Sequence, residues 1–340
     1  MNEASQAGAS EQARSMRAWL SVTPGLAGMK LSETRLPVSG PGTALVRVEA
    51  AALNFSDLLM MDDRYQIRPP RPFIPGQEIA GTVVSAAGDC ALAVGDRVAS
   101  KVEWGGFAEH AVVRDDMAIP IPAAMSACEA AALPVAYTTA LVALLESTTV
   151  MPGETVLVLA AGGGVGLATV QLARHLEARV VAAAGAAERC ALAHAHGADE
   201  TVDYRAKDWT DRVRAMTGDR GIDVIVDPVG GEIGEQALRL LGWGGRLLVV
   251  GFSSGKIPQI PANRLLLRRA SAIGVYWDHD RDGPMLRRIS QRMLDLCAAG
   301  VIRPCIGAVL GFEDLPAALV ALRERKSAGK TVLSLQRETR

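Results

Sequence analysis

A glycine-rich turn carries the clearest chemical signal in the sequence. It reads AAGGGVG (160–166), directly after an apolar strand and directly before an amphipathic helix. Such a turn lets main-chain N–H groups approach a pyrophosphate, and the helix dipole favours its negative charge. Gly163 and Gly166 hold the second and third positions of a GxGxxG motif, whereas Ala161 stands at the first. An ordinary tight turn is the alternative, but the strand–turn–helix context favours a dinucleotide site. The candidate cofactor-binding residues here are Ala161, Gly163, Gly164, Val165 and Gly166.

The end of the next strand indicates which dinucleotide would bind. That strand ends Ala183-Ala184-Gly185 and has no acidic residue, whereas NAD sites place an Asp or Glu there for the ribose 2′-hydroxyl. Arg189 follows four residues later, and a guanidinium group can pair with a 2′-phosphate. Glu188 lies beyond the strand end, on the following helix, and a solvated surface charge is the alternative interpretation of Arg189. We therefore expect NADPH rather than NADH, with Gly185 and Arg189 near its adenosine end.

The turn belongs to a segment in which buried strands alternate with helices. The expected strands are 155–161, 179–185, 200–204, 222–229, 246–251 and 270–277. Helices are expected at 167–178, 187–199 and 235–241. This alternation predicts parallel βαβ units and an α/β, doubly wound Rossmann sheet.

The flanking segments have a different texture. Short alternating strands broken by Gly and Pro run from 16 to about 135 and predict a compact barrel-like β-region. After Trp277 the expected helices 284–300 and 313–325 flank 302–311, and we interpret them as a return to the first domain. The predicted organisation is a disordered leader (1–15), a catalytic domain (16–135 and 278–340) and an inserted NADPH-binding domain (136–277).

Composition limits the class of protein. A chain of 340 residues with 49% hydrophobic and 21% charged residues fits a globular protein of two domains. The net charge of −1 gives no attraction to nucleic acid or to an anionic membrane. The five cysteines include no CxxC pair, and the sequence shows neither a signal peptide nor an apolar run of membrane-spanning length. We expect a cytoplasmic protein.

Several strings, taken in order, resemble the medium-chain dehydrogenase/reductase superfamily, and within it the quinone oxidoreductase branch. The resemblance spans about 16–335 and rests on LNFSDLL (53–59), PFIPGQEIAGTV (72–83), GDRV (95–98), GGFAEH (105–110), LPVAYTTA (133–140), AAGGGVG (160–166), HGAD (196–199), IDVIVDPVGG (222–231), GGRLLVVGF (244–252) and GVYW (274–277). It implies a Rossmann domain inserted in a GroES-like β-barrel catalytic domain.

The ligands that this family uses for zinc are missing. Zinc alcohol dehydrogenases of the family use a Cys before the first helix and the His of a GHE motif, where this chain has Asn54 and Gly76-Gln77-Glu78. No cysteine lies between GDRV and GGFAEH, where the structural zinc lobe would stand. Zinc requires Cys, His or carboxylate ligands at short distance, so we predict a zinc-free enzyme with no metal site.

The resemblance also implies the residues of the site. It points to Asn54 and Tyr65 on the substrate side and to Tyr137 beside the nicotinamide, as catalytic candidates. A half-buried packing residue is the alternative for each tyrosine. The further cofactor-binding candidates that it implies are Thr138, Tyr204, Gly251, Phe252, Tyr276, Arg325 and Lys330.

Without a Lewis acid, reduction of a conjugated acceptor is easier than alcohol–ketone interconversion, because conjugation carries charge to a remote oxygen. The expected activity is hydride transfer from NADPH to a quinone. The alternatives are NADPH-dependent reduction of an activated C=C bond (enone, alkenal or enoyl thioester) and an NADPH-binding protein with little turnover. We expect a small-molecule substrate and a homo-oligomer, dimer or tetramer, formed through the edge strand 270–277.

Overall fold

The computed structural model describes residues 15–336, and within them the chain forms two compact units. Unit 1 comprises the chain up to Pro134 and again from Ile306, and unit 2 comprises Val135–Cys305. The inserted unit starts one residue before the predicted position but ends well after 277. Apart from Ser15, which begins the first strand, the predicted leader lies outside the described residues.

The strands expected in 16–135 are present in unit 1. Within 15–134 and 306–336, its larger sheet has the order β14-β15-β3-β4-β5-β7, with β6 paired to β3, and β1 and β2 form a separate pair. These strands are β1 (Ser15–Ser21), β2 (Met29–Arg35), β3 (Thr43–Ala52), β4 (Glu78–Ala86), β5 (Arg97–Lys101), β6 (His110–Arg114), β7 (Ala118–Pro120), β14 (Ile306–Gly311) and β15 (Lys330–Ser334).

Apolar residues of both chain segments form the core of unit 1. Phe107, Leu58 and Met60 from the first segment pack in one cluster with Phe312 and Leu319 from the second. The helices of this unit are α2 (Phe55–Met61), α3 (Ala127–Ala131) and α11 (Leu315–Arg323). The return of the C-terminal segment therefore completes the core, and β15 lies beside β3 in the sheet.

The predicted Rossmann sheet is present in unit 2. All of 135–305 is described, and its six strands are parallel in the order β10-β9-β8-β11-β12-β13. Numbered from β8, this is the 3-2-1-4-5-6 order of dinucleotide-binding sheets. The strands are β8 (Thr155–Leu159), β9 (Arg179–Ala184), β10 (Glu200–Asp203), β11 (Ile222–Asp227), β12 (Leu241–Val249) and β13 (Ser271–Gly274).

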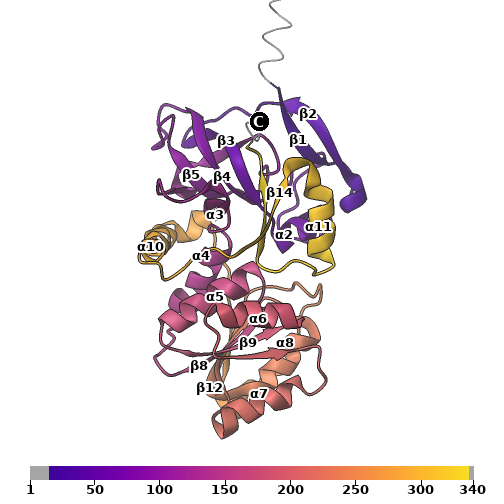
Figure 1. Cartoon of the computed structure of the whole chain (residues 1–340), viewed down its shortest axis with the longest axis vertical. Helices are drawn as coiled ribbons and strands as arrows, with labels where there is room; N and C mark the ends of the chain where they lie inside the picture. Colours follow the sequence, from indigo (N-terminus) through magenta and orange to yellow (C-terminus); the bar gives the residue numbers. More distant parts are fainter. Residues whose placement is uncertain (1–14, 337–340) are drawn as a thin grey trace, which may run out of the picture. The chain divides into compact units, whose positions relative to one another are not determined.

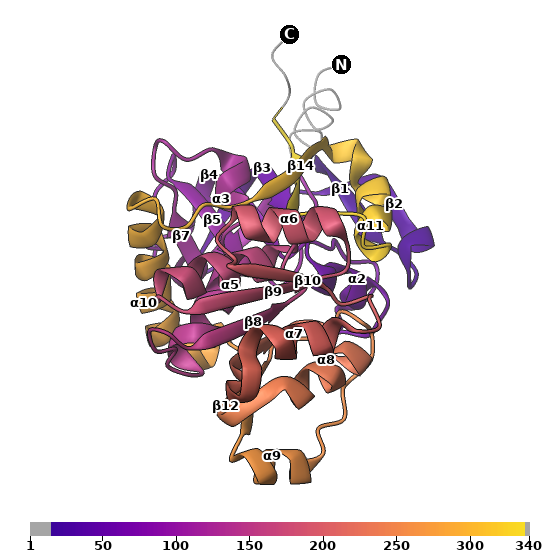
Figure 2. The same ribbon diagram turned by 60° about the horizontal axis from the view of Figure 1, so that its bottom comes forward.

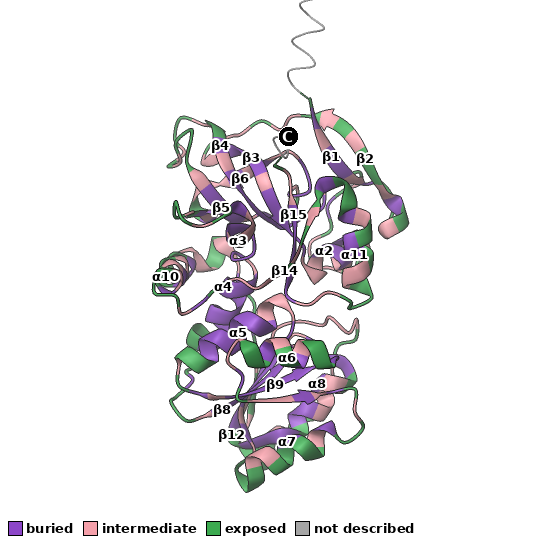
Figure 3. Cartoon of the chain, viewed as in Figure 1, coloured by how far each residue is buried: buried purple, intermediate pink, exposed green. Residues whose placement is uncertain are grey.

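Helices cover both faces of this sheet. Figures 1 and 2 show α5 and α6 on one face and α7 and α8 on the other. Every residue of β8 is buried, as Figure 3 shows for the centre of the sheet, which explains its continuous apolar sequence. The helices are α4 (Ala136–Leu141), α5 (Gly164–His175), α6 (Ala187–Ala195), α7 (Trp209–Thr217), α8 (Gly231–Ala237), α9 (Ala262–Arg268) and α10 (His279–Ala298).

Helix α10 accounts for the difference in the predicted boundary. We expected the chain after Trp277 to rejoin the first domain, but α10 packs against α4 of unit 2. Its buried residues Leu286, Ile289, Met293 and Leu296 recur at helical spacing and form one apolar face. The chain therefore returns to unit 1 only at β14.

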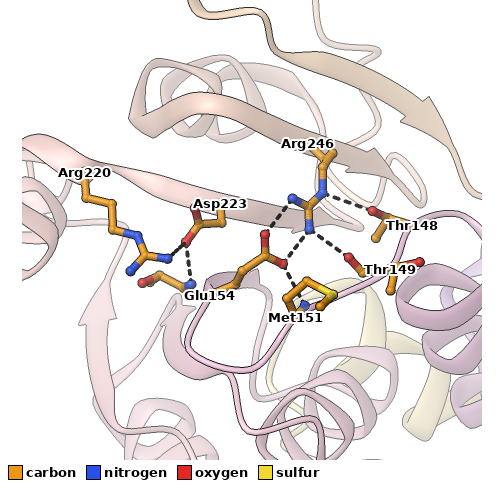
Figure 4. Close-up of polar contacts among 8 residues, drawn as sticks. Thr148, Thr149, Met151, Glu154, Arg220, Asp223 and Arg246 are labelled. Atoms are coloured by element: carbon orange, nitrogen blue, oxygen red, sulfur yellow. Dashed lines mark hydrogen bonds and ion pairs between the residues drawn. The ribbon is translucent and has the colours of Figure 1, made fainter.

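An ion-pair network fixes the amino-terminal end of β8, opposite the end that bears the glycine turn (Figure 4). Arg246 forms two hydrogen bonds to the Glu154 carboxylate, at 2.8 and 2.7 Å, and donates to the Thr148 hydroxyl at 3.0 Å. Asp223 accepts from the Thr155 N–H at 2.7 Å and pairs with Arg220 at 3.2 Å. The Arg246 guanidinium lowers the pKa of Glu154. These charges hold β8, β11 and β12 together, away from the candidate site.

Within 15–336, no helix has both the length and the apolar character needed to cross a membrane.

Candidate functional site

The glycine turn connects β8 to α5 at the carboxyl end of the sheet. Gly163 is the N-cap of α5 and donates its N–H to the carbonyl oxygen of Ala160 at 2.9 Å. Ala160 adopts a left-handed φ of 50°, a conformation that disfavours residues with a side chain. The Ala161 N–H donates to the carbonyl oxygen of Ala183 on β9, at 3.1 Å. The turn, which also includes Gly164 and Val165, is thus tied to the neighbouring strand.

Gly166 is required by close packing of the helix on the turn. A Cβ there would lie 2.3 Å from the carbonyl oxygen of Ala160 and 2.7 Å from the Cα of Ala161. Gly163 is different, since a Cβ would meet only the Ala160 oxygen, at 3.4 Å. This is the expected division of labour in a dinucleotide turn: one glycine lets helix and strand approach, and another leaves the main chain open to a pyrophosphate.

Arg189 lies directly against the glycine turn. A Cβ on Gly162 would fall 2.4 Å from the Cβ of Arg189 and 2.9 Å from its Cγ. The Arg189 Nε is buried and has no hydrogen-bond partner among the described residues. A buried guanidinium nitrogen without an acceptor is costly unless an anion supplies one. The residues present therefore fit a dinucleotide that places a phosphate group beside Arg189.

Tyr204 directly follows β10, the edge strand that lies beside β9. A Cβ on Gly185 would lie 3.0 Å from the ring of Tyr204 and 3.2 Å from its hydroxyl oxygen. Asp203, the last residue of β10, pairs in register with Ala184. Its carboxylate is held by the exposed Arg205, at 2.7 Å from Nη2. Gly162 thus lies against Arg189, and Gly185 lies against Tyr204.

The loop after β12 packs on the loop after β11. A Cβ on Gly230 would lie 2.9 Å from the ring of Phe252, and the Gly251 N–H donates to the carbonyl oxygen of Asp227 at 3.3 Å. The buried Asp227 carboxylate accepts the N–H groups of Val229 and Gly230, both at 2.8 Å. Burial raises the pKa of Asp227. Gly251 and Phe252 therefore lie at the carboxyl ends of the strands, where the sequence places them.

The hydroxyl of Tyr137 is committed within unit 2. It donates to the carbonyl oxygen of Arg303 at 2.8 Å and lies 3.3 Å from Oε1 of Gln171. Gln171 also accepts the Arg303 N–H at 2.8 Å and donates to the Arg303 carbonyl oxygen at 3.0 Å. Burial raises the pKa of Tyr137, so its phenol stays protonated. This geometry fits a role in fixing the 303 segment better than proton donation to a substrate.

The neighbours of Tyr137 have contrasting environments. Thr138 is buried in α4, and Trp277 donates its indole N–H to the Thr139 hydroxyl at 3.1 Å. Tyr276 is 63% exposed. In the described structure Trp277 is therefore the packed aromatic of the GVYW string, and Tyr276 offers its ring to solvent.

In unit 1, Asn54 caps the short helix α2. Its N–H donates to Oδ2 of Asp57 at 2.8 Å, the reciprocal half of a capping box. Asp57 is fully buried, and this burial raises the pKa of its carboxyl from 3.8 to about 7. Asp57 thus completes the cap of α2.

Lys330 forms a buried cluster with Asn54 and Glu78. Its Nζ donates to Oε2 of Glu78 at 2.6 Å, to Oδ1 of Asn54 at 2.9 Å and to the carbonyl oxygen of Leu53 at 3.0 Å. The side chains of Lys330 and Glu78 are only 6% and 0% exposed. Asn54 Nδ2 in turn donates to Oε2 of Glu78 at 3.0 Å. Lys330, which the sequence predicts to bind the cofactor, thus uses its three N–H donors in hydrogen bonds within unit 1.

Gln77 occupies the place of a zinc-binding histidine. It is 1% exposed, and neither atom of its side-chain amide has a hydrogen-bond partner among the described residues. Within 15–336, no three His, Cys, Asp or Glu side chains are grouped closely enough to hold a metal ion. A neutral amide is a poor zinc ligand, so the residues at this position do not fit a catalytic zinc.

The last two candidates lie on irregular chain. Tyr65 is partly buried against the core of unit 1, in the loop that follows α2, and its carbonyl oxygen accepts from Arg68 Nε at 3.4 Å. Arg325 is exposed, with a left-handed φ of 57°, just after α11.

Sequence reasoning missed three participants. In the sequence, Glu78 is only the last residue of the degenerate zinc motif Gly76-Gln77-Glu78, and Gln171 and Arg303 lie outside the motifs. A signal for Glu78 existed, because a carboxylate in an apolar strand requires a cation. Gln171 on α5 gave no comparable signal, since a polar residue on a helix is usually solvated.

Comparison with known proteins agrees with this geometry. The family model described as "Alcohol dehydrogenase GroES-like domain" matches residues 40–123, and "Zinc-binding dehydrogenase" matches 164–298. The chain is 41% identical to quinone oxidoreductase-like protein 2 of Bos taurus over 300 residues, which covers 87% of this chain and 86% of the relative. It is 31% identical to the quinone oxidoreductase of Sus scrofa, covering 90% and 94% of the two chains.

A solved structure extends the similarity to three dimensions. The structure of the quinone oxidoreductase of Thermus thermophilus, described with its NADPH complex, matches with a TM-score of 0.79 at 36% identity, over 94% of this chain and 100% of that one. The similarity therefore extends over both the GroES-like and the Rossmann part of this chain. This chain belongs to the medium-chain dehydrogenase/reductase superfamily, in its quinone oxidoreductase branch.

Proposed function

We propose that the protein transfers a hydride from NADPH to a quinone, without a metal ion. The observation that carries the proposal is the buried, unpartnered Arg189 Nε beside Gly162 at the glycine turn. The names of the relatives from Bos taurus, Sus scrofa and Thermus thermophilus support the quinone as acceptor.

Unit 2 supplies the residues that would hold the cofactor. The N–H groups of Gly164 and Val165, in the first turn of α5, would receive the pyrophosphate, and Gly163 would let it approach because it has no side chain. Arg189 and Tyr204 would take the 2′-phosphate, and Gly251 and Phe252 are the candidates for the nicotinamide end. We also propose Thr138 and Tyr276 of this unit, and Arg325 of unit 1, as cofactor contacts. For Tyr137 the committed hydroxyl favours a positioning role.

Unit 1 supplies the candidates for the substrate. When bound, NADPH supplies the hydride; one quinone, one NADPH and one proton then give a hydroquinone and NADP⁺. The quinone oxygen gains negative charge as the hydride adds to the conjugated system. A hydrogen-bond donor aimed at that oxygen lowers the barrier, and Asn54 and Tyr65 are the proposed donors.

The test is oxidation of NADPH by purified protein, followed by absorbance with 1,4-benzoquinone, 9,10-phenanthrenequinone and 2-alkenals, each repeated with NADH and with a chelator. The expected result is rapid, chelator-resistant oxidation of NADPH by quinones. Turnover of alkenals with little quinone reduction would instead assign an activated C=C bond as the substrate. NADPH binding without reduction of any acceptor would leave the chain as a cofactor-binding protein.

We further propose that two copies assemble through β13. This strand is the edge of the sheet, and large apolar side chains near it are exposed: Trp243, Leu266, Leu267 and Tyr276 are 67%, 77%, 72% and 63% exposed. Helix α9, which stands out from the rest of unit 2 in Figure 2, buries none of its residues. An exposed edge strand beside an apolar surface favours pairing across a two-fold axis. Sedimentation of Leu266→Lys/Leu267→Lys against wild type tests this, and an unchanged sedimentation coefficient would contradict it.

A further inference from the structure

The Lys330 cluster gives the Asn54 amide a fixed orientation. An ammonium group only donates hydrogen bonds, so the amide atom 2.9 Å from Lys330 Nζ is the oxygen. An ionised carboxylate only accepts, so the atom 3.0 Å from Glu78 Oε2 is the nitrogen. The two charged groups therefore require the same orientation of the amide. The opposite orientation would bring two donors together at Lys330 and two acceptors together at Glu78.

One hydrogen of this amide is left for another acceptor. Asn54 Nδ2 carries two hydrogens, and one goes to Glu78 at 3.0 Å. The other has the carbonyl oxygen of Ala52 at 3.4 Å, a long and weak contact. Asn54 is partly exposed, whereas Lys330 and Glu78 are buried. The charged partners of the amide are thus buried, whereas Asn54 itself, which carries the weakly engaged hydrogen, is partly accessible to solvent.

The buried ammonium also changes the amide as a donor. A positive charge 2.9 Å from the amide oxygen draws electron density from the nitrogen and strengthens its N–H groups as donors. The effect is largest where water does not screen it, and the side chain of Lys330 is 6% exposed.

We propose that Lys330 is a positioning residue for the reduction: it orients and polarises the Asn54 amide, so that the weakly engaged Nδ2–H donates to the substrate oxygen on which negative charge develops. This inference rests on the proposed function. It gives the cluster a role other than stability, because a buried ion pair is by itself weak evidence for stabilisation.

The test removes both charges of the pair, so that neither is left buried alone. Lys330→Met/Glu78→Gln keeps similar volumes and an acceptor for Asn54 Nδ2, and Arg114→Met/Asp116→Asn neutralises an exposed pair of unit 1 as the control. We expect kcat with 1,4-benzoquinone to fall about tenfold, with KM for NADPH unchanged. This fall is smaller than the roughly 10²- to 10³-fold fall in kcat that follows the loss of a whole oxyanion donor. The control should keep the wild-type kcat. Thermal melts confirm that each variant is folded.

A double-mutant comparison separates positioning from general damage. In an Asn54→Ala background, Lys330→Met/Glu78→Gln should lower kcat no further, because the ammonium acts through the missing amide. An equal fall of kcat in both backgrounds, or a wild-type kcat in the variant with Asn54 present, would overturn the proposal.

A measurement without turnover keeps this inference distinct from the proposed function. In ¹⁵N-labelled protein, the side-chain amide protons of Asn54 are identified by their loss in Asn54→Ala. The proton that is not hydrogen-bonded to Glu78 should move upfield in Lys330→Met/Glu78→Gln, and both protons should stay in place in the control. If the resonance of that proton does not move, the polarisation is refuted even if quinone reduction is observed, and if it moves, the polarisation is supported even if no quinone is reduced.

Discussion

The candidate cofactor turn of unit 2 is made of main chain, whereas the Lys330 cluster of unit 1 is made of buried side chains. At the turn, Gly166 and Gly163 serve by having no side chain, and the buried Nε of Arg189 has no hydrogen-bond partner among the described residues. In the cluster, Lys330 and Glu78 already satisfy each other. The first region is built to receive a charged ligand, and the second is built to hold one neutral amide in place. The two should therefore fail differently when mutated.

The largest expected effect is the loss of stability when only one member of the buried Lys330–Glu78 pair is replaced. Lys330→Met leaves the Glu78 carboxylate buried without a cation and should lower the free energy of unfolding by about 3–5 kcal/mol. Lys330→Met/Glu78→Gln should recover most of that loss. Arg246→Met, which removes a pair whose side chains are 19% and 16% exposed, should cost less. Urea unfolding measures all three, and equal losses for the two single variants would contradict the contrast between buried and half-exposed pairs.

Two glycines of the turn should separate folding from binding. Gly166→Ala places a Cβ 2.3 Å from the Ala160 carbonyl oxygen and should lower the free energy of unfolding by about 1–3 kcal/mol. Gly163→Ala meets only a 3.4 Å contact, so its stability should match wild type while its affinity for NADPH falls. Thermal melts and NADPH fluorescence titrations report the two properties. If Gly163→Ala bound NADPH as tightly as wild type, the pyrophosphate would not lie at this turn.

Arg189→Ala should change which dinucleotide binds without unfolding the protein. Loss of charge-assisted hydrogen bonds of about 1.5–3 kcal/mol predicts a roughly 10- to 150-fold weaker affinity for NADPH. The affinity for NADH should hardly change, because NADH has no 2′-phosphate. The control is Arg212→Ala, which removes an exposed arginine of α7 that pairs with Asp208. Equal losses for NADPH and NADH would place Arg189 outside the 2′-phosphate site.

Local sequence patterns predict the cofactor turn, but they do not predict the Lys330 cluster. The turn follows from seven consecutive residues and the strand before them, and the parallel sheet follows from buried strands alternating with helices. The cluster does not, because Glu78 and Lys330 are 252 residues apart and meet only through the pairing of β15 with β3 and of β3 with β4. The bond from Tyr137 to Arg303 likewise spans 166 residues. The boundary expected at 277 differs because an amphipathic pattern shows that α10 has an apolar face, but not which unit buries it.

The smallest expected effect concerns the acid beside the cluster. Burial raises the pKa of Asp57 from 3.8 to about 7 in the folded protein, with Lys330 opposing this shift and Glu78 adding to it. The folded state therefore holds a proton that the unfolded state releases, so stability is lost as pH rises from about 4 through about 7. Between pH 6 and 7 this loss is at most about 1.4 kcal/mol. Asp57→Asn keeps an acceptor for the Asn54 N–H but cannot ionise, so its free energy of unfolding should fall less over that interval. Urea unfolding at pH 6 and 7 compares it with wild type and with the exposed Glu103→Gln, which should keep the wild-type slope; identical slopes for all three proteins would show that Asp57 is already ionised at pH 6.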